Sequence, residues 1–530
     1  MNLKVAVSGA TQLAVDSNVS SLISDQVASR LFSKDFTLWG SQAEEESRIR
    51  LGWISSAQES LALVPKIYSL RDQLKSIGVD RFVLCGMGGS SLAPEVITNT
   101  AQKKLVILDS TNPEQVASAL SGDLARTAVI VSSKSGSTVE TDSQKSLFEA
   151  AFTAAGIDKT ERIIIVTDPG SPMESAATAD GYRVFNADPT VGGRYSALTA
   201  FGIVPSGLAG VDIETLLHEA IAVVEILSAD SPKNPALILA AAMARTKKSS
   251  TLCDKLLLVE DGTKILGLGD WAEQLIAEST GKDSKGILPV VATAAAPEIK
   301  ANSDDVVLVR LVDSADSSEK DEIAVSGPLG AQFLLWECAT VLASRLIGIN
   351  PFDQPDVESA KIAARSMLES RENSTPSGIA VSGLEVTSTF DTNSSDDLSV
   401  IFERLFSKLA VDGYVSIHAY LDRTAHARAN QLRDLIAVKT GRPVTFGWAP
   451  RFLHSTGQYH KGGPKRGVFI QLVSKPTLEV PVPGREFTLG ELIRSQAEGD
   501  SKVLSELGMP VLTLTFDDVE RALATIEESL

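Results

Sequence analysis

The stretch RFVLCGMGGSSLAPE, residues 81–95, joins a short apolar run to a glycine-rich turn and then to a helix-like segment. Three similar apolar runs follow it: KLVIL at 104–108, AVIVS at 128–132 and RIIIVT at 162–167. Val and Ile are common in these runs, and helix-like stretches separate them. Apolar strands that alternate with helices are typical of a parallel sheet covered on both faces. The sequence therefore predicts an α/β fold.

The same pattern restarts twice further along the chain. The second block has apolar runs at 255–261, 286–291 and 305–312 and then helix-like stretches at 330–346 and 356–369. The third block follows the polar segment 371–378. Its expected strands are near 378–387, 414–419, 443–447, 467–472 and 510–516, and its expected helices near 398–410, 424–440 and 518–529. We expect four regions: a mainly helical segment at 1–75, sheet domains at 76–248 and 249–372, and a C-terminal α/β region at 373–530.

Composition excludes several classes of protein. The 530 residues include 49 basic and 67 acidic side chains, a net charge of −18, which opposes a nucleic-acid-binding surface. Three widely spaced cysteines without CxxC spacing indicate buried thiols of a cytosolic protein. We expect no secretory signal and no membrane span, because the start lacks a signal pattern and the apolar runs are short.

The glycine-rich turn after 81–85 is a candidate anion site. Gly88 and Gly89 leave room for a ligand near backbone amides, and Ser90 adds a hydroxyl donor. Two other interpretations stay open: a turn without ligand, and a GxGxxG dinucleotide fingerprint with Asp109 as its acid. The fingerprint is incomplete, because Ser91 stands where its third glycine belongs.

The segment VSSKSGSTVET at 131–141 is a second candidate, again between a strand and a helix. Its relevant side chains are Ser133, Lys134, Ser135 and Thr138. Hydroxyls at a helix N-terminus suit a phosphate group, although a serine-rich helix cap has the same composition. Because loops at the carboxyl ends of parallel strands share one crevice, two such loops favour binding. Neither loop has the GxxxxGK[ST] pattern of a Walker loop.

Two further segments offer charged groups. In VGGRYSALTAFG at 191–202, paired glycines let the guanidinium of Arg194 approach a ligand and stabilise an oxyanion. In DWAEQLIAESTGK at 270–282, we expect Asp270 to cap a helix on which Gln274 and Glu278 share a face. A helix C-terminus disfavours negative charge, so Glu278 there suits a general base. Taken by itself, this segment also fits a second interpretation, in which Glu278 is a solvated acid at the end of a helix.

The last two segments are NPFDQPDVESAK at 350–361, which ends on Lys361, and FLHSTGQYHKGGPKRG at 452–467. The second holds His454 and His460, two of five histidines in the chain. Neither segment has the spacing of a metal site, and HExxH does not occur. We therefore expect no metal. The basic part of 452–467 also fits a solvated loop.

Together these motifs resemble the glucose-6-phosphate isomerase family. The likeness covers about 50–475 and includes, in order, CGMGGSSLAP, SSKSGSTVET, GGRYSALTAFG, EQLIAESTGK and INPFDQPDVESAK. It is nearest to the long form that is fused behind transaldolase in bifunctional enzymes, which also has FLHSTGQYHKGGP. The length leaves no room for a transaldolase domain, so we expect the isomerase alone. The resemblance implies two sugar-isomerase (SIS) domains, each a parallel sheet flanked by helices, in a homodimer.

The resemblance also implies roles for single residues. Glu278 matches the base that moves a proton between C1 and C2, Arg194 the group that stabilises the enediolate, and Lys361 a lysine assigned to ring handling. Gln274 matches a substrate contact. The positions that match the phosphate loops are Ser90, Ser133, Ser135 and Thr138, with Lys134 beside them. The family's ring-opening histidine is missing between Glu278 and Lys361, so we assign its role to His454, with His460 as the fallback.

The expected function is therefore the reversible isomerisation of glucose 6-phosphate and fructose 6-phosphate through a cis-enediolate, in the cytoplasm and without a cofactor. The expected partners are these sugar phosphates, with no nucleic acid and no membrane. Three alternatives stay open: a non-catalytic sugar-phosphate sensor, an isomerase of another sugar phosphate such as mannose 6-phosphate, and an NAD-dependent dehydrogenase. A dehydrogenase leaves the 131–141 loop unexplained.

Overall fold

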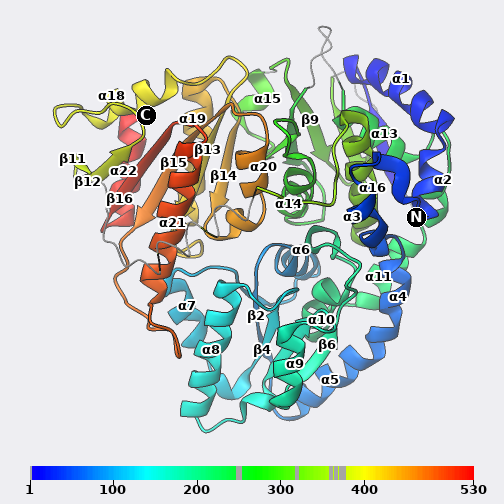
Figure 1. The fold of residues 1–530 in the computed structure, drawn as a ribbon, viewed down its shortest axis with the longest axis horizontal. Helices are drawn as coiled ribbons and strands as arrows, with labels where there is room; N and C mark the ends of the chain where they lie inside the picture. Colours follow the sequence, from blue (N-terminus) through cyan, green and yellow to red (C-terminus); the bar gives the residue numbers. More distant parts are fainter. Residues whose placement is uncertain are drawn as a thin grey trace.

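The computed structural model describes residues 3–245, 253–301, 303–316, 321–356 and 378–530, together with Ile362 and Leu368. Three sheets flanked by helices organise these residues (Figure 1). Two of the sheets correspond to the two predicted parallel-sheet blocks, and the third lies in the C-terminal region. The predicted α/β fold class is confirmed. The boundaries of the four regions stay a prediction.

The first sheet is entirely parallel, with the strand order β3-β2-β4-β5-β6. Its strands are β2 (Arg81–Gly86), β3 (Val106–Leu108), β4 (Thr127–Ser132), β5 (Ile163–Thr167) and β6 (Arg183–Asn186). The sequence predicted the first four, but missed β6, which is short and only half-buried. Because β2 and β4 are parallel neighbours, the loops that follow them leave the sheet at one edge.

Helices cover both faces of this sheet. They are α5 (Val64–Ser76), α6 (Leu92–Thr100), α7 (Pro113–Leu120), α8 (Val139–Ala154), α9 (Pro172–Ala179) and α10 (Ala200–Leu208). Alternate strand residues enter different cores: Val129 packs with Phe148 and Phe152 of α8, whereas Ile130 joins the larger core on the other face. Burial on both faces explains why the strands read as continuous apolar runs.

The second sheet has the order β1-β10-β9-β7-β8. Its strands are β1 (Lys4–Val7), β7 (Lys255–Glu260), β8 (Leu288–Thr293), β9 (Val306–Leu311) and β10 (Ile323–Ser326). The first of them, β1, pairs antiparallel with β10, and the other pairs are parallel. The N-terminal segment was expected to be mainly helical, and its strand KVAV was not predicted, because four residues carry too little periodicity.

The helices of this part of the chain surround the second sheet and the large core that it shares with the first. They are α1 (Ala10–Ser24), α2 (Val27–Phe32), α3 (Glu44–Ile49), α4 (Ser56–Ser60), α11 (Ile213–Ile221), α12 (Val224–Ser228), α13 (Pro235–Met243), α14 (Leu268–Thr280), α15 (Pro297–Ala301) and α16 (Leu329–Ile347). The expected cap of α14 was wrong. Gly267 precedes the helix with a φ of +80°, and Asp270 is its third residue. Glycine adopts this left-handed conformation without strain, so it can start the helix earlier.

The third sheet has the order β11-β12-β16-β15-β13-β14. Its strands are β11 (Ile379–Val381), β12 (Leu384–Ser388), β13 (Tyr414–Tyr420), β14 (Val444–Trp448), β15 (Gly467–Ser474) and β16 (Val511–Phe516). Its helices are α18 (Leu398–Phe406), α19 (Leu432–Thr440), α20 (Gly457–Gly462), α21 (Leu489–Glu506) and α22 (Val519–Ser529). The four parallel strands match predicted runs, but the long helix α21 was not predicted.

Four charged side chains join the C-terminal region to the first sheet. Arg451 contacts both Asp109, just after β3, and Glu95 on α6, and Arg423 also pairs with Glu95 (2.9 Å) and Asp109 (3.4 Å). Burial alone would raise the pKa of Asp109, but the two arginines hold it below its usual value. We call these four residues the Arg451 cluster. It fixes the short helix η9 (Arg451–His454) against the first sheet.

Candidate active site

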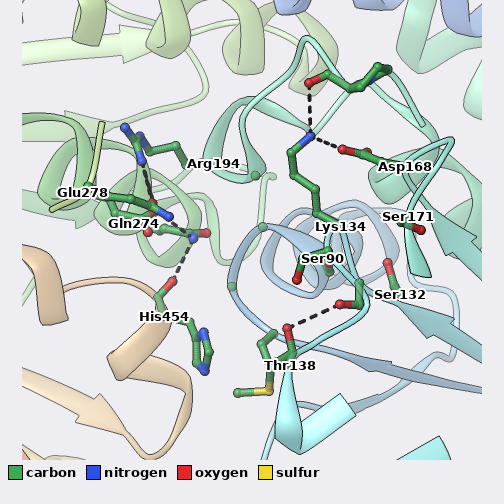
Figure 2. Close-up of a pocket in the computed structure, with 18 of the residues that line it drawn as sticks. Ser90, Ser132, Lys134, Thr138, Asp168, Ser171, Arg194, Gln274, Glu278 and His454 are labelled. Atoms are coloured by element: carbon green, nitrogen blue, oxygen red, sulfur yellow. Dashed lines mark hydrogen bonds and ion pairs between the residues drawn. The ribbon is translucent and has the colours of Figure 1, made fainter. Parts of the chain in front are cut away.

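A cavity of about 600 Å³ lies where loops of the first sheet, helix α14 and helix η9 meet (Figure 2). Eleven predicted site residues line it: Gly88, Gly89, Ser90, Ser133, Lys134, Ser135, Thr138, Arg194, Gln274, Glu278 and His454. The twelfth, Lys361, lies outside the described residues. Sequence reasoning missed other lining residues, among them Arg50, Asp168, Ser171 and Gln354.

One wall of the cavity is the 133–138 loop, which leads into α8 and which we call the hydroxyl loop. The hydroxyls of Ser133 and Thr138 are 3.3 Å apart, and the Ser133 hydroxyl accepts a hydrogen bond from the amide of Gly136 (3.1 Å). Thr138 is the N-cap residue of this 16-residue helix. Hydroxyl donors and the positive end of a helix dipole therefore face the same space, which suits an anion.

Lys134 lines the cavity and pairs with Asp168, which follows β5. Its ammonium also donates to the carbonyl of Pro189 (3.4 Å). Burial raises the pKa of Asp168, and the contact with Lys134 only partly offsets this effect. The pair thus places one positive and one negative group beside the hydroxyl loop.

The two glycines after β2 allow other parts of the site to come close. Gly88 has a φ of +55°, and a Cβ there would lie 2.7 Å from the carbonyl of His454 and 2.8 Å from Gln274 Nε2. A Cβ on Gly89 would collide with the carbonyl of Gly193, next to Arg194. The glycines therefore serve close packing between this turn and the catalytic candidates, in addition to any contact with a ligand.

Arg194 is held rigidly on the opposite wall. Its side chain is 4% exposed and donates to Ser279 Oγ (2.9 Å), Gln354 Oε1 (3.0 Å) and the carbonyls of Pro351 (2.7 Å) and Asp353 (3.0 Å). Its Nη1 also lies 3.8 Å from Oε2 of Glu278. A guanidinium fixed in this way keeps its charge in the cavity and needs little reorganisation to meet a developing oxyanion.

Glu278 and Gln274 project together from the last two turns of α14, as the predicted spacing requires (Figure 2). The amide of Gln274 donates to Glu278 Oε2 (3.1 Å) and to the carbonyl of His454 (2.8 Å). The Glu278 side chain is only 8% exposed. A buried carboxylate between an amide and a guanidinium is positioned to exchange a proton with a ligand in the cavity.

His454 comes from the C-terminal region and has a carboxylate partner that the sequence did not predict. Its Nε2 lies 3.0 Å from Oε1 of Glu140, which also accepts from Gln496 (2.7 Å). The buried Glu140 can only accept when ionised, so it favours the proton on Nε2 and leaves Nδ1 as a base. In the sequence, Glu140 reads as an ordinary acid in the first turn of a helix.

The other candidate histidine lies elsewhere. His460 is buried beneath the third sheet, where its Nδ1 contacts the Tyr414 hydroxyl (3.0 Å) and its Nε2 contacts Ser416 (3.3 Å). Burial lowers the pKa of His460 well below its usual value. His460 does not line the cavity, so the fallback assignment has no support in the geometry. Asp109, the acid of the alternative dinucleotide interpretation, pairs with Arg451 and belongs to the Arg451 cluster.

Within the described ranges, no three His, Cys, Asp or Glu side chains gather as a metal site would require. The same ranges contain no helix with the length and apolar character of a membrane span.

Similarity to known proteins covers much of the chain. Residues 74–295 match the family model described as phosphoglucose isomerase. Over 339 residues the chain is 28% identical to the "Probable glucose-6-phosphate isomerase" of Haloarcula marismortui, an alignment that covers 54% of this chain and 77% of that protein.

Two crystal structures resemble the fold. One, of a hypothetical protein from Thermus thermophilus, has a TM-score of 0.59 at 23% identity. The match covers 69% of this chain and 100% of that chain. The other, a glucose-6-phosphate isomerase from Chlamydia trachomatis, has a TM-score of 0.52 at 19% identity. The match covers 66% of this chain and 79% of that chain. At these identities, the two structures are evidence for the fold alone.

Proposed function

We propose that this chain is a member of the glucose-6-phosphate isomerase family and interconverts glucose 6-phosphate and fructose 6-phosphate through a cis-enediolate. The observation that carries the proposal is that one cavity combines a hydroxyl loop at a helix N-terminus, the buried Glu278 beside Arg194, and His454. The family match over 74–295 supports the same reaction.

In this proposal the 133–138 loop and Ser90 bind the phosphate, so the sugar extends toward α14. Glu278 removes the proton from C2 of the aldose and returns it to C1. In the reverse reaction it removes the proton from C1 of the ketose and returns it to C2. Arg194 lies beside Glu278 and stabilises the negative charge that develops on the enediolate oxygens. The hydroxyl proton on the C2 oxygen of the aldose passes at the same time to the C1 oxygen. Electrons move only between C1 and C2 of one substrate, so the step balances without an oxidant or reductant.

His454 acts before the proton transfer. Opening the sugar ring needs a group that exchanges a proton with the ring oxygen and the anomeric hydroxyl. His454 suits this role, because Glu140 fixes its tautomer. The role of Lys361 in ring handling stays a prediction, as do the homodimer, the cytoplasmic location and the likeness to the transaldolase-fused form.

A coupled assay of fructose 6-phosphate conversion to glucose 6-phosphate tests the proposal. We expect steady turnover by the purified chain without added cofactor. Absence of turnover with intact sugar-phosphate binding would contradict it. A parallel assay with mannose 6-phosphate would then separate an isomerase of another sugar from a non-catalytic sensor.

The hydroxyl loop gives a prediction about affinity. We expect Thr138→Val, which removes one hydroxyl at nearly constant shape, to raise KM for fructose 6-phosphate about 10-fold, because a hydrogen bond to a charged group contributes about 1.5 kcal/mol. The value of kcat changes little, since the phosphate is remote from the reacting carbons. Thr153→Val is the matched control, because Thr153 is exposed on the same helix and does not line the cavity. A loss in kcat with unchanged KM would remove Thr138 from phosphate binding.

His454 gives a prediction about the form of the substrate. We expect His454→Ala to lower kcat/KM for cyclic glucose 6-phosphate by about 100-fold, within the range of general acid–base catalysis. The loss is milder for D-erythrose 4-phosphate, which stays open because its ring-closing hydroxyl carries the phosphate. The steady-state rates of both substrates are measured beside His426→Ala, whose histidine pairs with Glu520 away from the cavity. Equal losses on both substrates would argue against ring opening by His454.

A further inference from the structure

The 350–354 segment is held between two buried cations. On one side, Arg194 donates to the carbonyls of Pro351 (2.7 Å) and Asp353 (3.0 Å) and to Gln354 Oε1 (3.0 Å). These bonds account for most of the hydrogen bonds of the guanidinium. The orientation of Arg194 in the cavity therefore depends on where the 350–354 segment lies.

On the other side is Lys282, just after the end of α14. Its ammonium donates to the carbonyls of Asn350 (2.8 Å) and Asp353 (2.6 Å) and to Asp353 Oδ1 (2.6 Å). The Lys282 side chain is 2% exposed. A buried ammonium is costly unless all of its protons are bound, and here three acceptors from one short segment bind them.

The two cations share an acceptor. The carbonyl of Asp353 receives hydrogen bonds from Arg194 and from Lys282. We propose that Lys282 is a positioning residue that fixes the guanidinium of Arg194 through the 350–354 segment. The inference rests on the proposed function, because it assigns Arg194 to the enediolate. Lys282 does not line the cavity, so it acts through Arg194 and not on the substrate.

Lys282 also brings a pH dependence. Burial, followed by repulsion from Arg194, lowers the pKa of Lys282 to about 8, against the attraction of Asp353 and Glu278. Below this pH the ammonium has three donors for its three acceptors. Above it the neutral amine has two, and the ion pair with Asp353 is lost. The hold on the segment therefore weakens as the pH rises through about 8.

A double-mutant cycle separates positioning from general stability. We expect Lys282→Met to lower kcat about 10- to 100-fold in the wild-type background, because small misplacements of a catalytic group have effects of this size. In the Arg194→Met background the same change lowers kcat less than about 3-fold, since the group that Lys282 positions is gone. Lys285→Met is the matched control, because this nearby lysine has an exposed side chain whose ammonium donates at 3.4 Å to the carbonyl of Ile347.

The second readout is the pH profile of kcat/KM, which reports groups of the free enzyme. We expect the wild-type value to fall above about pH 8 and Lys282→Arg, which stays charged, to keep its activity there. Thermal unfolding of each variant checks that it is folded. Equal losses from Lys282→Met in both backgrounds, or an alkaline fall that Lys282→Arg leaves unchanged, would overturn the inference.

Failure of the proposed function looks different. A wild-type chain without turnover contradicts that function directly. The positioning role of Lys282 is then tested by the affinity for 5-phosphoarabinonate, a sugar acid phosphate whose carboxylate resembles an enediolate. Weakening by Lys282→Met only when Arg194 is present supports the positioning role, and equal weakening in both backgrounds contradicts it.

Discussion

Replacing Glu278 with glutamine is expected to lower kcat by at least about 100-fold, because the amide cannot accept the proton of the substrate C–H bond. The affinity for the sugar phosphate survives, since the 133–138 loop and Ser90 are unchanged. The coupled assay gives kcat, and inhibition by inorganic phosphate gives the integrity of the anion site. The substitution is nearly isosteric, so Arg194 and Gln274 keep a hydrogen-bonding neighbour.

Glu273→Gln is the control for this experiment. Glu273 lies on the same helix but lines a separate cavity with Asp270 and Glu95. Turnover close to the wild-type value is expected in the control. Near-normal turnover in Glu278→Gln would remove Glu278 from the role of base, whatever the control shows.

Replacing Arg194 with methionine is expected to lower kcat by about 100- to 1000-fold, the range found when one oxyanion donor is removed. The loss is larger in kcat than in affinity, because the charge on the enediolate exists only after the proton has left. Steady-state kinetics in both directions measure the two parameters. A pure rise in KM would instead make Arg194 a contact to the ground state of the substrate.

Arg194→Lys is the companion variant. Lysine keeps the charge but cannot reproduce the planar fork that reaches Ser279, Pro351 and Gln354. We expect an intermediate kcat. Unfolding temperatures are compared in parallel, because the methionine variant removes the four hydrogen bonds that the buried guanidinium donates.

The strands that the sequence predicted most clearly are those that are buried on both faces of a sheet. Strands β2, β4 and β5 are continuous apolar runs because helices cover both faces of the first sheet. Strands β1 and β6 lie at the edges of their sheets and are short, so they carry little pattern. Helix α21 was missed because its stretch SQAEGDSK is polar and contains glycine, although Gln496 and Asp500 within it are buried.

The site was predictable where its residues follow a strand or share a helix face. The hydroxyl loop follows β4, and Gln274 and Glu278 are four residues apart on α14. Glu140 and Lys282 could not be predicted, because an acid in the first turn of a helix and a lysine after a glycine usually face solvent. Only tertiary packing places Glu140 against His454 and Lys282 against the 350–354 segment.

The Arg451 cluster has a consequence for how the proposed activity would fail. The histidine assigned to ring opening reaches the cavity only because η9 is fixed to the first sheet, whereas Glu278 and Arg194 belong to elements before residue 300. The charges of the cluster are largely buried, so salt screens them little. In the proposed function, loosening this interface would therefore impair ring opening more than proton transfer, because Arg194 and Glu278 would keep their contacts to one another. Turnover of cyclic sugars would fall before turnover of open-chain sugars.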